Sequence, residues 1–146
     1  MIDIQSICQL FLSVFLGAII GVERELKRKE AGLQTHSLVA LGSCFFTMIS
    51  FKMIEVFSQN SGVTFDPIRV IQAVAIGIGF IGAGVIFRQP SGIVGLTTSA
   101  GLWIAAAIGI AVGVKMYYLA IFATFLSLLV LFGFGLLEQR FFGGDQ

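Results

Sequence analysis

The chain has 146 residues, of which 57% are apolar and only 12% are charged, and its formal net charge is +1. Soluble domains carry about 25% charged residues, so this composition excludes an ordinary soluble domain and predicts a membrane protein with several spans. A nearly neutral chain also lacks the basic face that a nucleic-acid-binding protein needs. His36 is the only histidine, and Cys8 and Cys44 have no partner at ligand spacing, so a histidine metal cluster within one chain is excluded.

Five apolar segments are each long enough to cross a bilayer, which takes about 20 residues. Only Lys115 interrupts the apolar run 95–137, which is too long for one crossing, so the run must fold back near Gly113 and Lys115. We therefore expect an all-α integral membrane bundle of about five transmembrane helices, surrounded by the lipid bilayer and forming one domain over residues 1–146. The expected spans are residues 4–22, 36–56, 67–87, 96–113 and 116–137.

A charged segment follows the first span, and seven of the eight residues from Glu23 to Glu30 carry a charge. With five spans, six Lys and Arg residues fall on the side of this loop and three on the other side. Positive residues concentrate on the cytoplasmic side of membrane proteins. The sequence therefore predicts an outside N-terminus and a cytoplasmic C-terminus.

The orientation of the chain in the membrane does not explain why this segment also contains acidic residues, because the topology rule counts only Lys and Arg. Glu23 and Glu25 either belong to a solvated interfacial run or pair with Arg24, a neighbouring helix or a partner. We expect residues 27–29 mainly to set orientation, so that a Lys27→Gln change is nearly silent. Glu23, Arg24 and Glu25 begin at the membrane edge, where we expect specific pairing to matter.

The third span contains "GIGFIGAG", residues 77–84, whose glycines follow the order of a dinucleotide-binding fingerprint. No strand precedes it and no acid lies twenty residues further on, so nucleotide binding is not supported. On a helix, Gly77 and Gly84 share one face, and Gly79 and Gly82 lie on the opposite face. Neighbouring helices could then approach from both sides, which predicts that the third span is central.

The fourth and fifth spans differ in the size of their side chains. The fourth carries a stripe of small residues suited to close helix packing, namely Thr98, Gly101, Ala105, Gly109 and Gly113. The fifth presents large apolar residues that we expect to face lipid, namely Phe122, Phe125, Leu126, Leu129 and Phe132.

The stretch "FDPIRV" starts the third span and has two interpretations. Asp66 is either an ion ligand or a helix cap before a proline, with Arg69 within pairing distance one turn along. Thr97 and Thr98 suit the start of the fourth span. No base accompanies these threonines and no nucleophile–base set is present, so we expect neither an enzyme nor a cofactor.

Three stretches together resemble the membrane domain of the MgtC/SapB family: "GVERELKRKEAGLQTHSLVALG", "DPIRVIQAVAIGIGFIGAGVI" and "GLTTSAGLWIAAAIGIAVG". The resemblance implies a bacterial inner-membrane protein tied to growth at low magnesium and, in pathogens, to virulence through survival inside macrophages. The residues that match the functional motif of the family are Glu23, Arg24, Glu25, Gly32, Thr35, Asp66, Arg69, Thr97 and Thr98. The glycines that the resemblance assigns to helix packing are Gly77, Gly79, Gly82, Gly84, Gly101, Gly109 and Gly113.

The sequence departs from the family pattern in two places. Gln34 stands where members commonly have Arg, and the chain ends nine residues after Leu137, where many members continue into a soluble domain. The resemblance therefore implies a short form without that domain.

Two functions remain open. The first is a regulatory or interaction protein in adaptation to low magnesium and in membrane-energy homeostasis, with the ATP synthase or a second copy as partner. The alternative is a protomer of a small transporter or channel for Mg²⁺ or another cation. Magnesium needs oxygen ligands, and the expected topology places Glu23 and Glu25 on the opposite side of the membrane from Asp66. These acids are therefore not expected to build one metal site.

Overall fold

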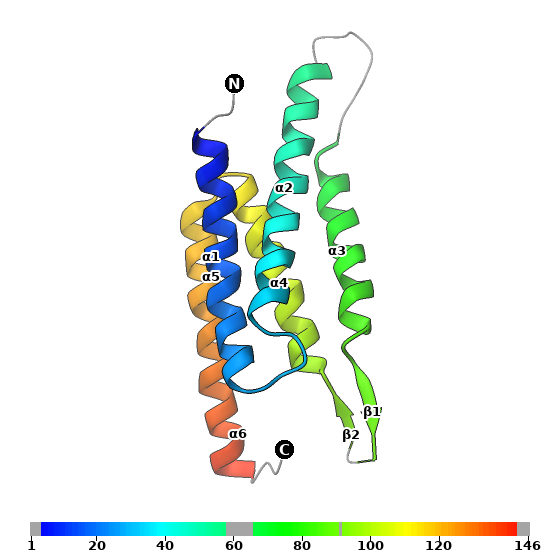
Figure 1. Ribbon diagram of the computed structural model, residues 1–146, viewed down its shortest axis with the longest axis vertical. Coiled ribbons are helices and arrows are strands. Elements are labelled where there is room, and N and C mark those ends of the chain that lie inside the picture. The colour runs from blue at the N-terminus through cyan, green and yellow to red at the C-terminus, as the bar shows by residue number, and fades with distance from the viewer. Residues whose placement is uncertain (1–3, 58–65, 91, 143–146) are drawn as a thin grey trace.

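The computed structural model describes residues 4–57, 66–90 and 92–142. Its long elements are helices that run alternately up and down, so that the first and last described residues lie at opposite ends of the bundle (Figure 1). The helices are α1 (Ile4–Leu26), α2 (Leu33–Phe57), α3 (Ile68–Ala83), α4 (Leu96–Gly113) and α5 (Tyr117–Leu129), which continues through a π-helical turn, η1 (Val130–Phe134), into α6 (Gly135–Phe142).

Helix length and composition confirm an all-α membrane bundle. Within the described residues, four helical segments are long and apolar enough to cross a membrane: α1, α2, α4 and Tyr117–Phe134. The helix at the third predicted span, α3, is not among these four. It is apolar but has only 16 residues, which corresponds to a length of about 24 Å against a hydrocarbon core of about 30 Å. The predicted reversal after the fourth span is confirmed, because α4 ends at Gly113 and Lys115 adopts a positive φ of 65°.

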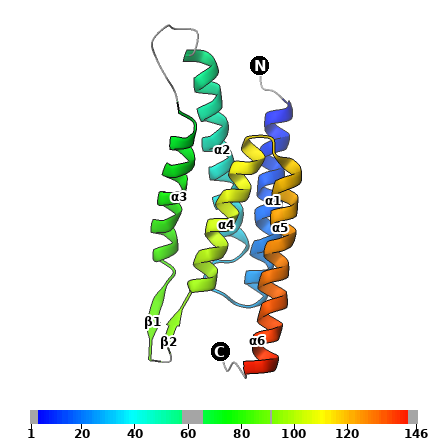
Figure 2. The ribbon, with the colours of Figure 1, turned by 180° about the vertical axis from the view of Figure 1, so that it is seen from behind.

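The central helix is α4, which packs against α1, α2, α3 and α5 (Figure 2). Its buried side is built largely from small residues, which let neighbouring backbones approach closely where lipid offers no hydrophobic driving force. The prediction that the third span is central is wrong for the described structure, because α3 lies at one side of the bundle and buries only Ile78 and Gly82.

Glycines mark the points of closest approach between the central helices. A Cβ added at Gly113 would lie 2.8 Å from the Thr47 side chain and 3.0 Å from the Cys44 carbonyl oxygen, and one at Gly109 would overlap the Ala40 carbonyl. On α1, a Cβ at Gly17 would lie 2.7 Å from the His36 carbonyl oxygen. The backbones of α1, α2 and α4 are therefore in contact, with no side chain between them at these points.

A β-hairpin joins α3 to α4, where the sequence had predicted that the third span continues to residue 87. Strands β1 (Phe87–Gln89) and β2 (Gly92–Val94) pair antiparallel, with Phe87 opposite Val94. The helix ends at Ala83 with Gly84 as its C-cap, and the residues expected to continue it pair in the hairpin instead. Gly95, with a φ of 87°, then turns the chain into α4 where any Cβ would overlap the Val85 carbonyl.

The other end of α4 is closed by a polar side chain from α1. The Gln9 amide nitrogen donates to the Val112 carbonyl at 2.8 Å and to the Gly113 carbonyl at 3.2 Å, and Gln9 is buried. The last carbonyls of a helix have no partner within the helix, and unsatisfied groups are costly in a membrane. The Gln9 side chain therefore provides a hydrogen-bond donor, from within the bundle, for the last carbonyl groups of α4.

Candidate functional site

The site begins with α1, which extends four residues beyond the predicted end of the first span and so carries charged side chains into the bundle. Glu23 and Arg24 are only 1% and 2% exposed. The Arg24 Nε donates to Glu23 Oε2, and Lys27 Nζ lies 2.8 Å from Glu23 Oε1. We call Glu23, Arg24 and Lys27 the charged cluster.

This arrangement decides between the two interpretations of Glu23. The solvated interfacial run is wrong for Glu23, because its carboxylate is buried and pairs with two cations of its own helix. Buried charges are tolerated when they are paired and hydrogen-bonded. The charged cluster is therefore part of the packed interior of the bundle.

Lys27 also links α1 to the last helices of the chain. Its Nζ donates to the Leu131 carbonyl oxygen at 2.9 Å and lies 5.1 Å from the centre of the Phe132 ring. Leu131 belongs to η1, and a π-helical turn changes the intrahelical bonding of its carbonyls. Lys27 therefore has a structural contact that the sequence did not lead us to expect, since its side chain connects Glu23 with η1. Its part in setting orientation stays a prediction.

The connection between α1 and α2 is held by the other two acids. Glu25 Oε2 accepts a hydrogen bond from the backbone N–H of Leu33, the first residue of α2, at 3.2 Å. The helix dipole of α2 also stabilises a carboxylate at this position. A Cβ at Gly32 would overlap the Glu25 carboxylate. Thr98 Oγ1 donates to Glu30 Oε2 at 3.0 Å, which ties the connection to the first turn of α4.

His36 lies beside this connection. In the sequence analysis it was considered only as the single histidine, which excludes a histidine metal cluster. It is fully buried, its Nδ1 is 3.0 Å from the Gly32 carbonyl oxygen, and its Nε2 has no hydrogen-bond partner within the described structure. A Cβ at Gly101 would lie 3.1 Å from Nε2, so the imidazole packs directly on α4. The signal that could have suggested this is a lone histidine in an apolar segment that must pack on a stripe of small residues.

The structure thus brings together part of the predicted motif. The members that meet at this end of the bundle are Glu23, Arg24, Glu25, Gly32 and Thr98; Thr97 lies at the same end but is exposed. Asp66 and Arg69 lie at the other end, where α3 begins (Figure 1). The prediction that Glu23 and Glu25 do not share a site with Asp66 is confirmed.

At that other end, the interpretation of Asp66 as a helix cap is confirmed. Its Oδ1 accepts the backbone N–H of Ile68 at 3.0 Å, and Arg69 Nε is 4.0 Å from Asp66 Oδ2. Both side chains are exposed, so the pair contributes little to stability. Among the residues that the structure describes, no three His, Cys, Asp or Glu side chains gather in a way that could hold a metal ion.

The predicted packing glycines fall into two groups. Those of α4 contact α2, and Gly82 of α3 packs on Ser99 of α4. A Cβ at Gly77 or Gly79 would meet no described atom within 4 Å, and one at Gly84 would meet only carbonyls of its own helix. The expectation that neighbours approach α3 on both sides is therefore wrong within the described chain.

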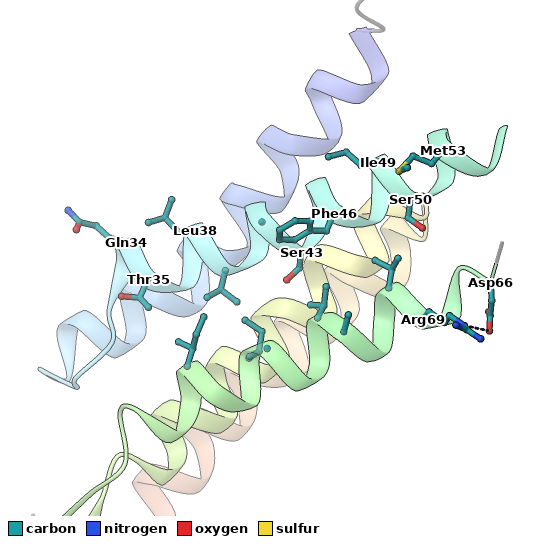
Figure 3. A pocket seen from close by; sticks show the side chains of 18 residues that line it. Gln34, Thr35, Leu38, Ser43, Phe46, Ile49, Ser50, Met53, Asp66 and Arg69 are labelled. Carbon is teal, nitrogen blue, oxygen red and sulfur yellow. Dashed lines mark ion pairs between the residues drawn. The ribbon is translucent and has the colours of Figure 1, made fainter. Parts of the chain in front are cut away.

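A groove of about 1230 Å³ separates α2 from α3 (Figure 3). Thr35 of the predicted motif and Gly77 line it, and most of its surface is apolar. Asp66 and Arg69 lie at one end of the groove, where α3 begins (Figure 3).

A bundle of apolar helices around a glycine-rich central helix, with ion pairs buried at one end, defines a polytopic helical membrane protein. The chain belongs to the MgtC family, whose profile matches residues 10–140. The resemblance noted in the sequence is thereby confirmed, together with the expected membrane character.

Three relatives illustrate the similarity. The chain is 42% identical over 128 residues to the "Putative magnesium transporter YhiD" of Escherichia coli K12, covering 87% of this chain and 59% of the relative. It is 40% identical over 130 residues to protein SapB of Bacillus subtilis (88% and 56%), and 38% identical over 122 residues to protein MgtC of Salmonella typhimurium LT2 (84% and 49%). The chain thus spans between about half and three-fifths of the length of these relatives. No solved structure matches the chain.

Proposed function

We propose that the protein is a regulatory or interaction protein of the bacterial inner membrane that acts in adaptation to low magnesium and in membrane-energy homeostasis. The observation that supports this most is the charged cluster. The Glu23 carboxylate is already bound by Arg24 and Lys27 of the same chain. Magnesium is held by several free oxygen ligands, so an acid neutralised in this way suits a structural or partner-positioning role better than ion transport.

The proposed orientation places the charged cluster on the cytoplasmic side, with the N-terminus outside. Exposed basic residues support it, because Arg28, Lys29, Arg88 and Arg140 lie at this end of the bundle. A partner in the membrane or at its cytoplasmic face would meet this end. We propose the ATP synthase as the first candidate and a role without catalysis of its own.

A flux assay on the purified full chain in liposomes tests this proposal, together with growth of cells that depend on the protein at limiting magnesium. We expect the chain to support growth and to leave the Mg²⁺ permeability of the liposomes unchanged. Pull-down from these cells should recover a membrane partner, and this recovery should be lost with Arg24→Gln. Growth support without any recovered partner would contradict the proposal.

The second candidate is a transporter or channel protomer for Mg²⁺ or another cation. The name of the relative YhiD favours it. In this case the same liposomes would take up Mg²⁺ in proportion to the protein they contain. Such uptake would overturn the regulatory proposal.

A further inference from the structure

The groove between α2 and α3 runs nearly the whole thickness of the bilayer. Its α2 wall extends from Gln34 to Met53, a distance of about 28 Å along the helix, against a hydrocarbon core of about 30 Å. A lipid tail covers one leaflet, so a groove of this length matches a membrane-spanning helix better than a lipid.

The floor of the groove is open. A Cβ at Gly42 on the α2 wall or at Gly77 on the α3 wall would meet no described atom within 4 Å. Gly109 and Gly113 on α4 instead touch α2, whereas Gly79, which lies outside the groove, is also open. Small residues in membrane helices typically allow another helix to approach closely, and here the described chain supplies none.

The chain itself carries a helix with the complementary shape, because α5 has an exposed ridge of large apolar side chains. Three of them follow one face of α5, where Leu119 is 52% exposed, Phe122 60% and Leu126 47%, and Val130 of η1, 43% exposed, continues this face. Helices α3 and α5 begin at the same end of the bundle and run in the same direction (Figures 1 and 2).

The two helices can be compared residue by residue from the ends where they begin. Ala73 lies five residues beyond the first residue of α3, and Phe122 lies five beyond the first residue of α5. Gly77 and Leu126 each lie nine residues beyond the same starting points. Counted from these starting points, small groove residues on α3 correspond to large ridge residues on α5.

Charges match at the entrance of both helices. Asp66 and Lys115 each lie two residues before the first residue of their helix. The Asp66 carboxylate is about half exposed and has Arg69 at 4.0 Å, whereas Lys115 Nζ is exposed and makes a hydrogen bond of 3.4 Å to Gln5. In this register Lys115 would approach Asp66, beside the Arg69 that lines the same end of the groove.

We propose that the groove between α2 and α3 of one copy receives α5 of a second copy. Copies of one membrane protein insert in the same orientation, so residues at equal depth meet. The two surfaces differ, so the contact is heterologous and repeats around a ring or along a chain of copies. This proposal does not depend on which of the two candidate functions is correct.

Disulfide cross-linking between two differently tagged full-length copies in native membranes tests the register. One copy carries Gly77→Cys and the other Leu126→Cys, with the exposed Cys8 changed to Ser and the buried Cys44 retained. We expect an oxidant to link the two tags. Ile76→Cys replaces Gly77→Cys in the control, because Ile76 is 76% exposed at almost the same depth but lies outside the groove. An absent link, or one equally strong in the control, overturns the proposal.

Filling the groove provides a second test. Gly77→Trp should abolish the cross-link of a separate pair, Ala73→Cys with Phe122→Cys, without changing membrane levels or the unfolding temperature. Gly79→Trp is the matched control, since Gly79 is equally open but lies outside the groove, and its cross-link should persist. If the Gly77→Trp protein still forms the link, the groove is not the contact. A groove that mass spectrometry finds filled by phospholipid or by another protein in the cross-linked material would also overturn the proposal.

Discussion

Arg24 is the residue on which the charged cluster depends most. It is buried with Glu23, and its guanidinium donates to the Glu23 carboxylate. Arg24→Gln removes the buried hydrogen bond to Glu23 Oε2 and leaves Lys27, which is partly exposed, as the remaining cation beside the Glu23 carboxylate.

We expect Arg24→Gln to lower the free energy of unfolding by about 1.5–3 kcal/mol, the range for a lost hydrogen bond to a charged group, and to abolish growth support at limiting magnesium. Thermal unfolding of the purified protein and the growth assay measure the two effects. Arg28→Gln is the matched control, because Arg28 is exposed outside the cluster. Equal behaviour of the two variants would contradict a special role for the buried guanidinium.

The Lys27→Gln change, which the sequence analysis expected to be nearly silent, should have a measurable effect. Gln at this position can still donate to the Leu131 carbonyl but loses the ion pair with Glu23 and the contact with the Phe132 ring. We expect Lys27→Gln to destabilise the protein, less than Arg24→Gln does. Hydrogen exchange should show the largest increase in residues 130–142. Lys29→Gln, at an exposed neighbouring position, should leave exchange unchanged, and the prediction fails if the two lysine variants cannot be told apart.

At the scale of elements, the bundle is organised around α4, whose glycines contact the backbone of α2. On α3, Gly77 and Gly79 face open space, whereas Gly82 packs on Ser99 of α4. Two helices with similar glycine content therefore have different tolerance for large side chains.

We expect Gly109→Leu to prevent assembly, because its side chain would overlap the Ala40 carbonyl on α2. Overpacking in a core costs about 1–3 kcal/mol even where side chains can move, and backbone is harder to displace. Gly79→Leu should accumulate and unfold like the parent, since its Cβ meets no described atom within 4 Å. Membrane levels and unfolding temperature after detergent extraction measure both. Normal accumulation of Gly109→Leu would show that α4 is not the tightly packed centre.

For the whole molecule, the up-and-down order of the helices places the two described ends of the chain at opposite ends of the bundle (Figure 1). The short α3 belongs to this order although it has only 16 residues. If it did not cross, both ends would lie on one side of the membrane.

We expect a reporter at the C-terminus to be active in the cytoplasm and one at the N-terminus to be active outside. The excess of exposed basic residues at the end that carries α6 is the physical reason. Fusions of an enzyme active only in the cytoplasm and of one active only outside measure both termini in the same cells. Signals from both termini on one side would refute five crossings.

The sequence by itself determined the class of protein, the helices and most of their limits. Length and hydropathy of a span are local properties, because every backbone group in lipid must be satisfied within its own helix. The turn at Gly113 and the Asp66 cap could be predicted for the same reason. The Glu23–Lys27 pair also lies within one helix, at a spacing of four residues, and was in principle readable.

Only the tertiary structure decided which helix is central and which charges are buried. Gly77 and Gly109 look alike in the sequence, and they differ because Ala40 lies against one of them while nothing described lies against the other. Lys27 and Lys29 look alike too, but only Lys27 reaches the Leu131 carbonyl, 104 residues away in the chain. Such contacts depend on how the helices are placed around one another, which the local pattern of one helix does not specify.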